Sequence, residues 1–329
     1  MTRDFVRPTT VLLALAAAIS VLLPGYDGRA QTAAGYPQSP VTIVVTSPAG
    51  GGVDGMTRTI AEGLAKKLKQ PFIVSNQAGG TGIIGTNAVA KATPNGYTLL
   101  FAISQFFQAP FLTKDPSYRM ADFVAVAQIA DLPSAFAVST NLKVKTLKEF
   151  VELARSRPGK LSYGITAGIG SSTHVYGEKF KAAAGIDLLG VPYRGDVPAI
   201  IDIRSGALDS LFGSVGNIAA QTDALVTVAV TGDKRSQRLP DVQTFDEQGV
   251  KLDGLIGMLA CFAPAGTPAE IVETLRKAID ELLDEPEVQK KLIALGAEPF
   301  DRKRDFAAYV AQQAQKWETT LKSMNLTGR

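Results

Sequence analysis

Two glycine-rich loops carry the residues of this chain that could do chemistry. The first follows a β-type run within residues 41–54 (VTIVVTSPAGGGVD), and the second repeats the plan within residues 161–176 (LSYGITAGIGSSTHVY). A glycine loop that leads into a helix exposes unpaired backbone N–H groups at the positive end of the helix dipole. Glycine also lets a ligand approach the backbone without a Cβ in the way. The pair of loops therefore indicates a clamp for an anion.

One such loop alone is equally consistent with a tight strand–helix turn that binds nothing. The second loop favours binding, because Ser171 and Ser172 add hydroxyl donors at the start of its helix. Two loops from different lobes of a protein could hold a carboxylate from both sides. We therefore expect a carboxylate as the ligand.

A dinucleotide site is the main alternative for the first loop. Residues 50–55 satisfy the pattern G-x-G-x-x-G after a strand. That pattern also requires an acidic residue roughly 20 positions later for the ribose, but the next strand ends at Asn76 without a carboxylate. Asp54 would also repel a phosphate at the helix start. No Gly-Lys-Ser/Thr sequence follows, so we expect no nucleotide cofactor.

Catalytic and metal chemistry have little support in this sequence. His174 is the only histidine and Cys261 the only cysteine. Ser172 and His174 are two residues apart and lie on different sides of a helix start, so they do not form a Ser-His relay. A metal needs three or four convergent ligands, and the apolar run around Cys261 raises the pKa of its thiol. We expect no catalytic residue, metal or cofactor, and His174 to support its helix start by hydrogen bonding.

The elements that position these loops alternate between strand-like and helix-like segments. This alternation predicts an α/β fold with largely parallel sheets. Apolar residues at helical spacing follow the first loop, and capping boxes are expected at Thr146–Glu149 and Thr267–Glu270. No low-complexity linker divides the chain. If two lobes exist, the apolar runs 134–138 and 255–262 are the candidates for passing between them.

The first thirty residues have the composition of a secretory signal. Arg3 and Arg7 precede an apolar run of thirteen residues at 11–23, which is shorter than the roughly 20 residues of a membrane span. Residues 28–30 (Gly-Arg-Ala) form a cleavage box, and a cut after Ala34 is the second choice. We therefore expect residues 1–30 to be a signal peptide and the protein to be exported. The remaining chain has a net charge of about +2 and no Lys/Arg block, which argues against nucleic-acid binding.

Many segments along the chain have a recognisable sequence. They are residues 36–37, 40–45, 48–54, 70–74, 89–100, 158–161, 171–174, 191–195 and 263–268. Together they resemble the Bug family, the extracytoplasmic substrate-binding proteins of tripartite tricarboxylate transporters. The resemblance covers almost the whole chain after the signal peptide.

The resemblance implies a type II-like periplasmic-binding-protein fold, with two α/β lobes that close around a ligand in the cleft between them. We expect residues 36–134 plus 256–329 to form lobe 1 and residues 135–255 to form lobe 2. It further implies a monomeric periplasmic receptor that captures a small organic carboxylate and delivers it to the membrane permease subunits of the transporter.

The resemblance places the ligand on the loop that follows the first strand of each lobe. We refer to residues 47–54 as the first loop and to residues 166–174 as the second loop. The ligand-binding residues expected on them are Ser47, Ala49, Gly50, Gly51, Asp54, Thr166, Ala167, Gly170, Ser171, Ser172 and His174. Further cleft positions are expected at Ser104, Gln105, Tyr193, Gly213 and Ser214.

One departure from the family bears on the ligand. Many members have an aspartate after the strand that follows a G-x-x-D sequence, where it can pair with the ammonium group of an amino acid. Here that position reads Gly213-Ser214. We therefore expect a ligand without an amine, either a di- or tricarboxylate or an aromatic acid. Phe106 and Phe107 favour an aromatic or long apolar body, although both rings are equally consistent with positions in the core. A secreted α/β enzyme acting on a small carboxylate and a periplasmic sensor remain alternatives.

Overall fold

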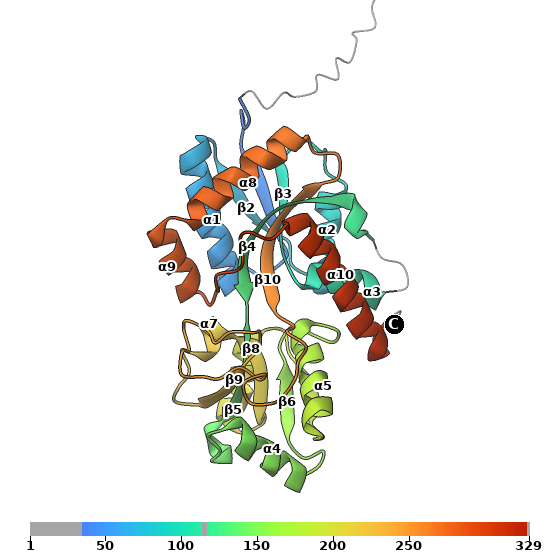
Figure 1. Ribbon diagram of the computed structural model, residues 1–329, viewed down its shortest axis with the longest axis vertical. Coiled ribbons are helices and arrows are strands. Elements are labelled where there is room, and N and C mark those ends of the chain that lie inside the picture. Colours follow the sequence, from blue (N-terminus) through green and yellow to red (C-terminus); the bar gives the residue numbers. More distant parts are fainter. Residues whose placement is uncertain (1–34, 114–116, 328–329) are drawn as a thin grey trace, which may run out of the picture. The chain divides into compact units, whose positions relative to one another are not determined.

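The computed structural model describes residues 35–113 and 117–327, so the expected signal peptide lies outside the described residues. Its strands form two five-stranded sheets (Figure 1). The first sheet has the order β2-β1-β3-β10-β4. Its strands are β1 (Val41–Val45), β2 (Phe72–Asn76), β3 (Thr98–Ile103), β4 (Phe123–Leu132) and β10 (Gly257–Pro264). Strands β2, β1 and β3 are parallel, and β10 runs antiparallel to both β3 and β4.

The second sheet repeats this plan in the order β7-β6-β8-β5-β9. Its strands are β5 (Ser134–Ser139), β6 (Ser162–Ile165), β7 (Leu189–Pro192), β8 (Ser210–Ser214) and β9 (Leu225–Val230). Strands β7, β6 and β8 are parallel, and β5 runs antiparallel to both β8 and β9. The carboxyl ends of parallel strands meet at one edge of a sheet. Each sheet therefore gathers three strand ends, where ligands of open α/β sheets bind.

Helices cover the first sheet, and we call the sheet with these helices the first lobe. They are α1 (Gly52–Leu68), α2 (Ile83–Ala90), α3 (Gln105–Leu112), α8 (Ala269–Leu283), α9 (Pro286–Ala294) and α10 (Phe306–Ser323). The apolar stripe expected after the first loop is present, since Met56, Ile60 and Leu64 of α1 are buried beside Ile43. Trp317 of α10 is also fully buried.

The second sheet and its helices form the second lobe. Its helices are α4 (Leu147–Ser156), α5 (Ser172–Ala184), α6 (Asp196–Ser205) and α7 (Val215–Ile218), with a short 3₁₀ turn at Thr140–Leu142. Two further 3₁₀ turns, at Gly80–Gly82 and Met120–Asp122, belong to the first lobe. Phe136 of β5 is at the centre of its aromatic core, with ring centroids 5.2 Å from Phe150, 5.1 Å from Phe180 and 4.7 Å from Phe212. The chain leaves the first sheet after Leu132 and enters the second at Ser134.

The two expected capping boxes differ from their predictions. The Thr146 hydroxyl accepts a hydrogen bond from the Glu149 N–H (3.2 Å), but the Glu149 carboxylate accepts from Lys145 rather than Thr146. The prediction at Thr267 is wrong, because α8 begins at Ala269 and the Thr267 hydroxyl donates to the Pro264 carbonyl (2.8 Å). Among the described residues, no helix has the length and apolar character that a membrane crossing requires.

Candidate functional site

The first loop is organised from the inside by Asp54. This side chain is only 4% exposed, although it lies in the first turn of α1. Its Oδ2 accepts hydrogen bonds from the Gly50 N–H (2.9 Å) and from Nε of Arg58 (3.0 Å). Its Oδ1 accepts from Nδ2 of Asn76 (2.9 Å), which also donates to the Ser47 carbonyl (3.1 Å). The carboxylate is thus used to hold the loop in shape.

The charge of Asp54 is maintained by these contacts. Burial alone would raise the pKa of this carboxyl, but the hydrogen bonds from Arg58, the Gly50 N–H and Asn76 outweigh burial. The pKa of Asp54 therefore lies below its ordinary value. The first loop is built around an ionised side chain that faces inward.

Positions 50 and 51 of the first loop are glycine for different physical reasons. Gly50 has a φ of +82°, a backbone conformation that strongly favours glycine. Gly51 has an ordinary φ of −82°, and a Cβ there would meet only the Pro48 carbonyl oxygen, at 3.7 Å. Neither backbone strain nor packing within the protein explains a glycine at position 51. Close approach of a ligand to its backbone would explain it.

The second loop follows β6 and not β5, the first strand of its lobe, so the expected position after the first strand is wrong for this loop. It has the same hydrogen-bond plan as the first loop, with different chemistry. The Gly170 N–H donates to Nδ1 of His174 (3.1 Å), four residues later, as the Gly50 N–H does to Asp54. Ser171 is the N-cap of α5, and its buried hydroxyl accepts from the His174 N–H (3.5 Å). His174 therefore supports the helix start and the loop by hydrogen bonding.

The parallel strand ends of the second sheet bring several expected site residues together. The Thr166 hydroxyl donates to the Phe212 carbonyl at the end of β8 (3.0 Å), and the Tyr193 N–H donates to the Ile165 carbonyl (2.9 Å). Ala167 forms an isolated bridge with Arg194. Gly213 and Ser214 follow on β8 itself. These residues form one neighbourhood at the carboxyl edge of the sheet.

Several expected contact groups already have partners in the protein. Ser104 is 3% exposed, and its hydroxyl accepts a hydrogen bond from the Met258 N–H (3.3 Å). Gln105, the next residue, begins α3. The Tyr193 hydroxyl donates to Asp202 (2.7 Å), and burial together with this carboxylate raises the pKa of Tyr193 to about 12. Phe106 and Phe107 are core residues, 3% and 1% exposed.

Gln108 joins the two lobes and was not predicted. It is fully buried on α3, and its Nε2 donates to Oγ of Ser172 at the start of α5 (2.8 Å). One turn later, Leu112 packs on Gly170 so closely that a Cβ there would lie 2.5 Å from Leu112 Cδ2. Helix α3 of the first lobe thus covers the second loop. The contact joins residues far apart in sequence, so no local pattern indicates it.

A second contact between the lobes lies beside the first loop. A Cβ on Gly216 of α7 would come within 2.7 Å of the Leu295 carbonyl oxygen, at the end of α9. A Cβ on Gly52 would lie 3.3 Å from the same oxygen. The Leu295 carbonyl therefore touches both the start of α1 and the segment that follows β8.

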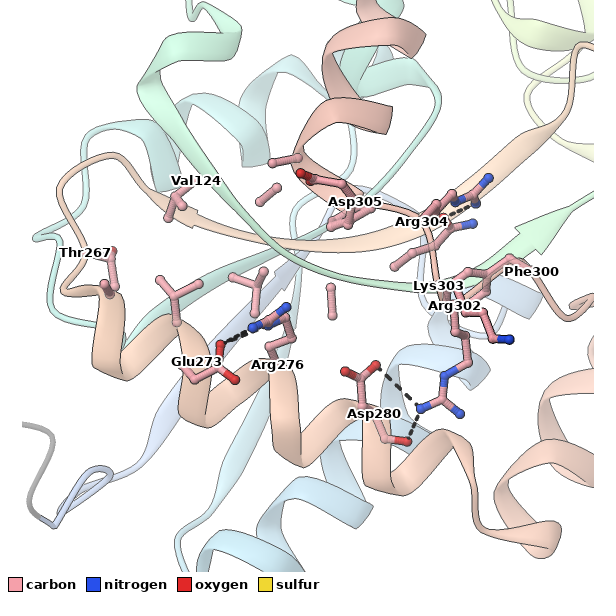
Figure 2. Close-up of a pocket in the computed structure, with 18 residues that line it drawn as sticks. Val124, Thr267, Glu273, Arg276, Asp280, Phe300, Arg302, Lys303, Arg304 and Asp305 are labelled. Carbon is pink, nitrogen blue, oxygen red and sulfur yellow. Dashed lines mark hydrogen bonds and ion pairs between the residues drawn. The ribbon is translucent and has the colours of Figure 1, made fainter.

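The cavity drawn in Figure 2 lies elsewhere, between α8, β4 and residues 300–307, and has a volume of about 720 Å³. None of the expected site residues lines it. Its three arginines are engaged locally: Arg276 pairs with Glu273, Arg302 pairs with Asp280, and Arg304 stacks over the Tyr309 ring. This arrangement favours a structural ion-pair network over an anion site.

Within residues 35–113 and 117–327, no group of three or more His, Cys, Asp or Glu side chains is placed to hold a metal ion. Cys261 is fully buried in β10, and burial raises the pKa of its thiol.

Comparisons with known proteins agree with this architecture. The model of the tripartite tricarboxylate transporter family receptor (TctC) matches residues 56–326. The protein BugT of Bordetella pertussis is 32% identical over 86% of this chain and 88% of its own length. The structure of R. palustris Rpa4515 with adipate superposes with a TM-score of 0.81, at 29% identity over 89% of this chain and all of that chain. The structure of MatC from Rhodopseudomonas palustris with bound malate superposes with a TM-score of 0.75, at 28% identity over 87% of this chain and all of that chain.

The structure of the periplasmic binding protein BugD superposes with a TM-score of 0.79, at 32% identity over 89% of this chain and all of that chain, which confirms the predicted two-lobed periplasmic-binding-protein fold. The chain belongs to the TctC family of tripartite tricarboxylate transporter receptors, which includes the Bug proteins.

Proposed function

We propose that this protein is a periplasmic receptor that captures a small organic carboxylate and delivers it to the permease subunits of a tripartite tricarboxylate transporter. One observation carries the proposal. Each lobe presents a glycine loop at the carboxyl edge of its parallel strands, and in each loop a glycine N–H is fixed by a side chain four residues later. Such loops hold anions through backbone N–H groups at helix starts.

The composition of the two loops favours a carboxylate. They contain backbone N–H groups, hydroxyls and glycines but neither lysine nor arginine. Relatives of this chain have been solved with adipate and with malate, both dicarboxylates. We infer that the ligand of this chain belongs to the same chemical class.

The exposure of the loop residues suggests a division of roles. Ala49, Gly50 and Gly51 are exposed and would contact the carboxylate, with Ser172 of α5 on the opposite side. The buried residues would hold the loops in place: Asp54, Ser104, Thr166 and Ser171.

Closure of the lobes would depend on the ligand. The contacts of Gln108 with Ser172 and of Gly216 with Leu295 both lie beside a loop. A carboxylate held by both loops would favour the arrangement in which these contacts form. We further propose that the lobes comprise residues 36–134 plus 256–329 and residues 135–255, that residues 1–30 direct export, and that the receptor is a monomer.

The structure changes two arguments about the ligand. Phe106 and Phe107 are core residues, so their support for an aromatic acid is removed. We therefore favour a di- or tricarboxylate. The expectation of an amine-free ligand assumed that no carboxylate lies near Gly213, but Asp196 accepts hydrogen bonds from Ser214. Amino acids thus belong among the ligands to test.

The experiment is a thermal-shift screen of the mature protein with succinate, malate, adipate, citrate, benzoate and aspartate, followed by calorimetry. A receptor should gain thermal stability with at least one di- or tricarboxylate, by an amount that grows with ligand concentration and without chemical change of the ligand. Absence of stabilisation by every carboxylate would contradict the proposal, and turnover of a carboxylate would favour an enzyme. Loss of carboxylate uptake on deletion of the gene would separate transport from sensing.

A further inference from the structure

We propose that Asp196 determines ligand specificity, by selecting carboxylates that carry a hydroxyl or amino group close to the carboxylate. The inference rests on the proposed function and deepens it. Asp196 is the first residue of α6 and is not among the ligand-binding residues expected from the sequence.

The hydrogen bonds of Asp196 all converge on one oxygen. Oδ2 accepts from the Ser214 N–H (3.0 Å), from the Ser214 hydroxyl (2.7 Å) and from Nδ2 of Asn217 (2.8 Å). A carboxylate has about four lone-pair positions on its two oxygens. These three donors therefore leave Oδ1 as the oxygen able to accept a further hydrogen bond.

Oδ1 of Asp196 faces residue 213, which is a glycine and so places no side chain against this oxygen. A Cβ on Gly213 would lie 3.1 Å from Oδ1 of Asp196, so any side chain there would press against this oxygen. Ser214 and Asn217 are exposed, and Asp196 is partly exposed. Asp196 therefore keeps partial solvent exposure beside Ser214, the last residue of β8.

Asp196 also lies close to both proposed ligand loops. The bridge between Ala167 and Arg194 places the start of α6 beside the second loop. Gly216, two residues after Ser214, contacts the Leu295 carbonyl, which also touches the start of α1. A ligand held between the loops would therefore lie near Asp196.

The charge of Asp196 is the reason to expect selectivity. Its three donors are neutral, and no lysine or arginine among the described residues forms an ion pair with it. An anionic ligand that approaches this carboxylate is repelled unless it presents a donor. A hydroxyl or ammonium group on the ligand would supply that donor and form a charge-assisted hydrogen bond.

The test compares pairs of ligands that differ in one donor group, by calorimetry on wild type and on Asp196→Asn. The pairs are succinate against malate or aspartate, adipate against 2-aminoadipate, and tricarballylate against citrate. Wild type should bind the donor-bearing member about tenfold or more tightly, the ratio expected for one hydrogen bond to a charged group. Asp196→Asn should reduce this preference to about threefold or less, chiefly by weakening the donor-bearing ligand.

The matched control is Asp223→Asn, which removes an exposed carboxylate of the second lobe that pairs with Arg204. It should leave every affinity ratio unchanged. Equal affinities within the pairs in wild type would overturn the inference, and so would an Asp196→Asn variant that weakens both members alike, since this would indicate a purely structural role. Absence of binding of any carboxylate to wild type would instead contradict the proposed function.

Discussion

The two loops share one backbone plan but fix it with different chemistry. In the first loop, the Gly50 N–H is held by Asp54, whose charge is supported by Arg58 and Asn76. In the second loop, the Gly170 N–H is held by the imidazole of His174, beside the hydroxyl of Ser171. An acceptor four residues after a loop glycine is thus the shared requirement. A carboxylate and an imidazole nitrogen both meet it.

The loops also differ in what covers them. Gly50 and Gly51 of the first loop are exposed, and within 4 Å a Cβ on either meets at most the Pro48 carbonyl oxygen. The second loop is packed under α3, where Gln108 and Leu112 contact it. We infer that the first loop is a site of ligand approach, whereas the second loop couples the ligand to the contact between the lobes.

The largest effect is expected from filling the open loop. Gly51→Val places a branched side chain where the ligand should approach, and its extended backbone (φ −82°, ψ 170°) tolerates valine. Carboxylate affinity should fall by about 100-fold or more, a loss of about 2.7 kcal/mol, while the unfolding midpoint of the ligand-free protein stays near that of wild type. Calorimetry and thermal unfolding measure the two. Unchanged affinity in a folded variant would remove the first loop from the site.

Gly52 is a poorer probe than Gly51 for a structural reason. A Cβ there would lie 3.3 Å from the Leu295 carbonyl oxygen, so a substitution disturbs packing as well as the loop. A loss of binding in Gly52→Val would therefore not separate the two causes.

Removal of the Asp54 carboxylate, which supports the first loop, should cause the next largest loss of ligand affinity. Asp54→Ala leaves the Gly50 N–H, Arg58 and Asn76 without their shared acceptor. We expect affinity to fall roughly 30-fold, about 2 kcal/mol, with a lower unfolding midpoint. Asp54→Asn, which keeps an oxygen acceptor, should lose less. Equal effects of the two variants would indicate that the charge is irrelevant.

The contribution of the Asp54 carboxylate to the unfolding free energy should also depend on pH, and the lowered pKa fixes the direction. The folded protein lowers the pKa of Asp54, so its ionisation stabilises the fold above the ordinary aspartate pKa of about 3.9. The stabilisation is lost as the pH falls through the lowered value. The difference in unfolding free energy between wild type and Asp54→Asn should therefore shrink from pH 6 to pH 3. A difference that stays constant would show that this carboxyl is not the titrating group.

The contact between the lobes can be weakened without touching either loop. Gly216→Ala introduces a Cβ 2.7 Å from the Leu295 carbonyl oxygen when the lobes are arranged as here, and the clash disappears when they separate. Affinity should fall about tenfold, or about 1.4 kcal/mol, because closure is penalised. The ligand-free unfolding midpoint should stay the same or rise, since alanine favours helix more than glycine. A lowered midpoint with normal affinity would make the contact structural only.

The smallest effect is expected at the imidazole. His174→Ala removes the acceptor of the Gly170 N–H, but Ser171 still caps α5 and α3 still covers the loop. Affinity should fall only about threefold, close to 0.7 kcal/mol. A loss as large as that of Asp54→Ala would mean that the two loops rely equally on this one hydrogen bond.

The α/β class and both loops were predictable because their signals are local, whereas the two-lobed fold was expected from the family resemblance. A β-branched run, a glycine cluster and a helical stripe such as that of Met56, Ile60 and Leu64 follow each other directly along the chain. The inward orientation of Asp54 was missed. This orientation depends on the hydrogen bond from Asn76 to Asp54. In the sequence, Asn76 served only as an argument against a nucleotide site, because it is not acidic.

Contacts between distant segments could not be predicted in this way. Gln108 meets Ser172 across 64 residues, and Asp196 meets Asn217 across 21, through packing that no local pattern encodes. The capping box at Thr267 failed for a local reason, because the Thr267 hydroxyl is taken by the Pro264 carbonyl and Pro268 becomes the N-cap.

The central claim is that both loops hold one carboxylate, and amide chemical shifts measure this most directly. The ¹⁵N-labelled mature protein is titrated with the carboxylate that stabilises it most in the thermal-shift screen. The account predicts that the amides of Gly51 and Gly52 and those of Ser172 and Thr173 shift together and saturate at the same ligand concentration. Shifts confined to one loop, or to the distant segment around Arg302, would contradict it.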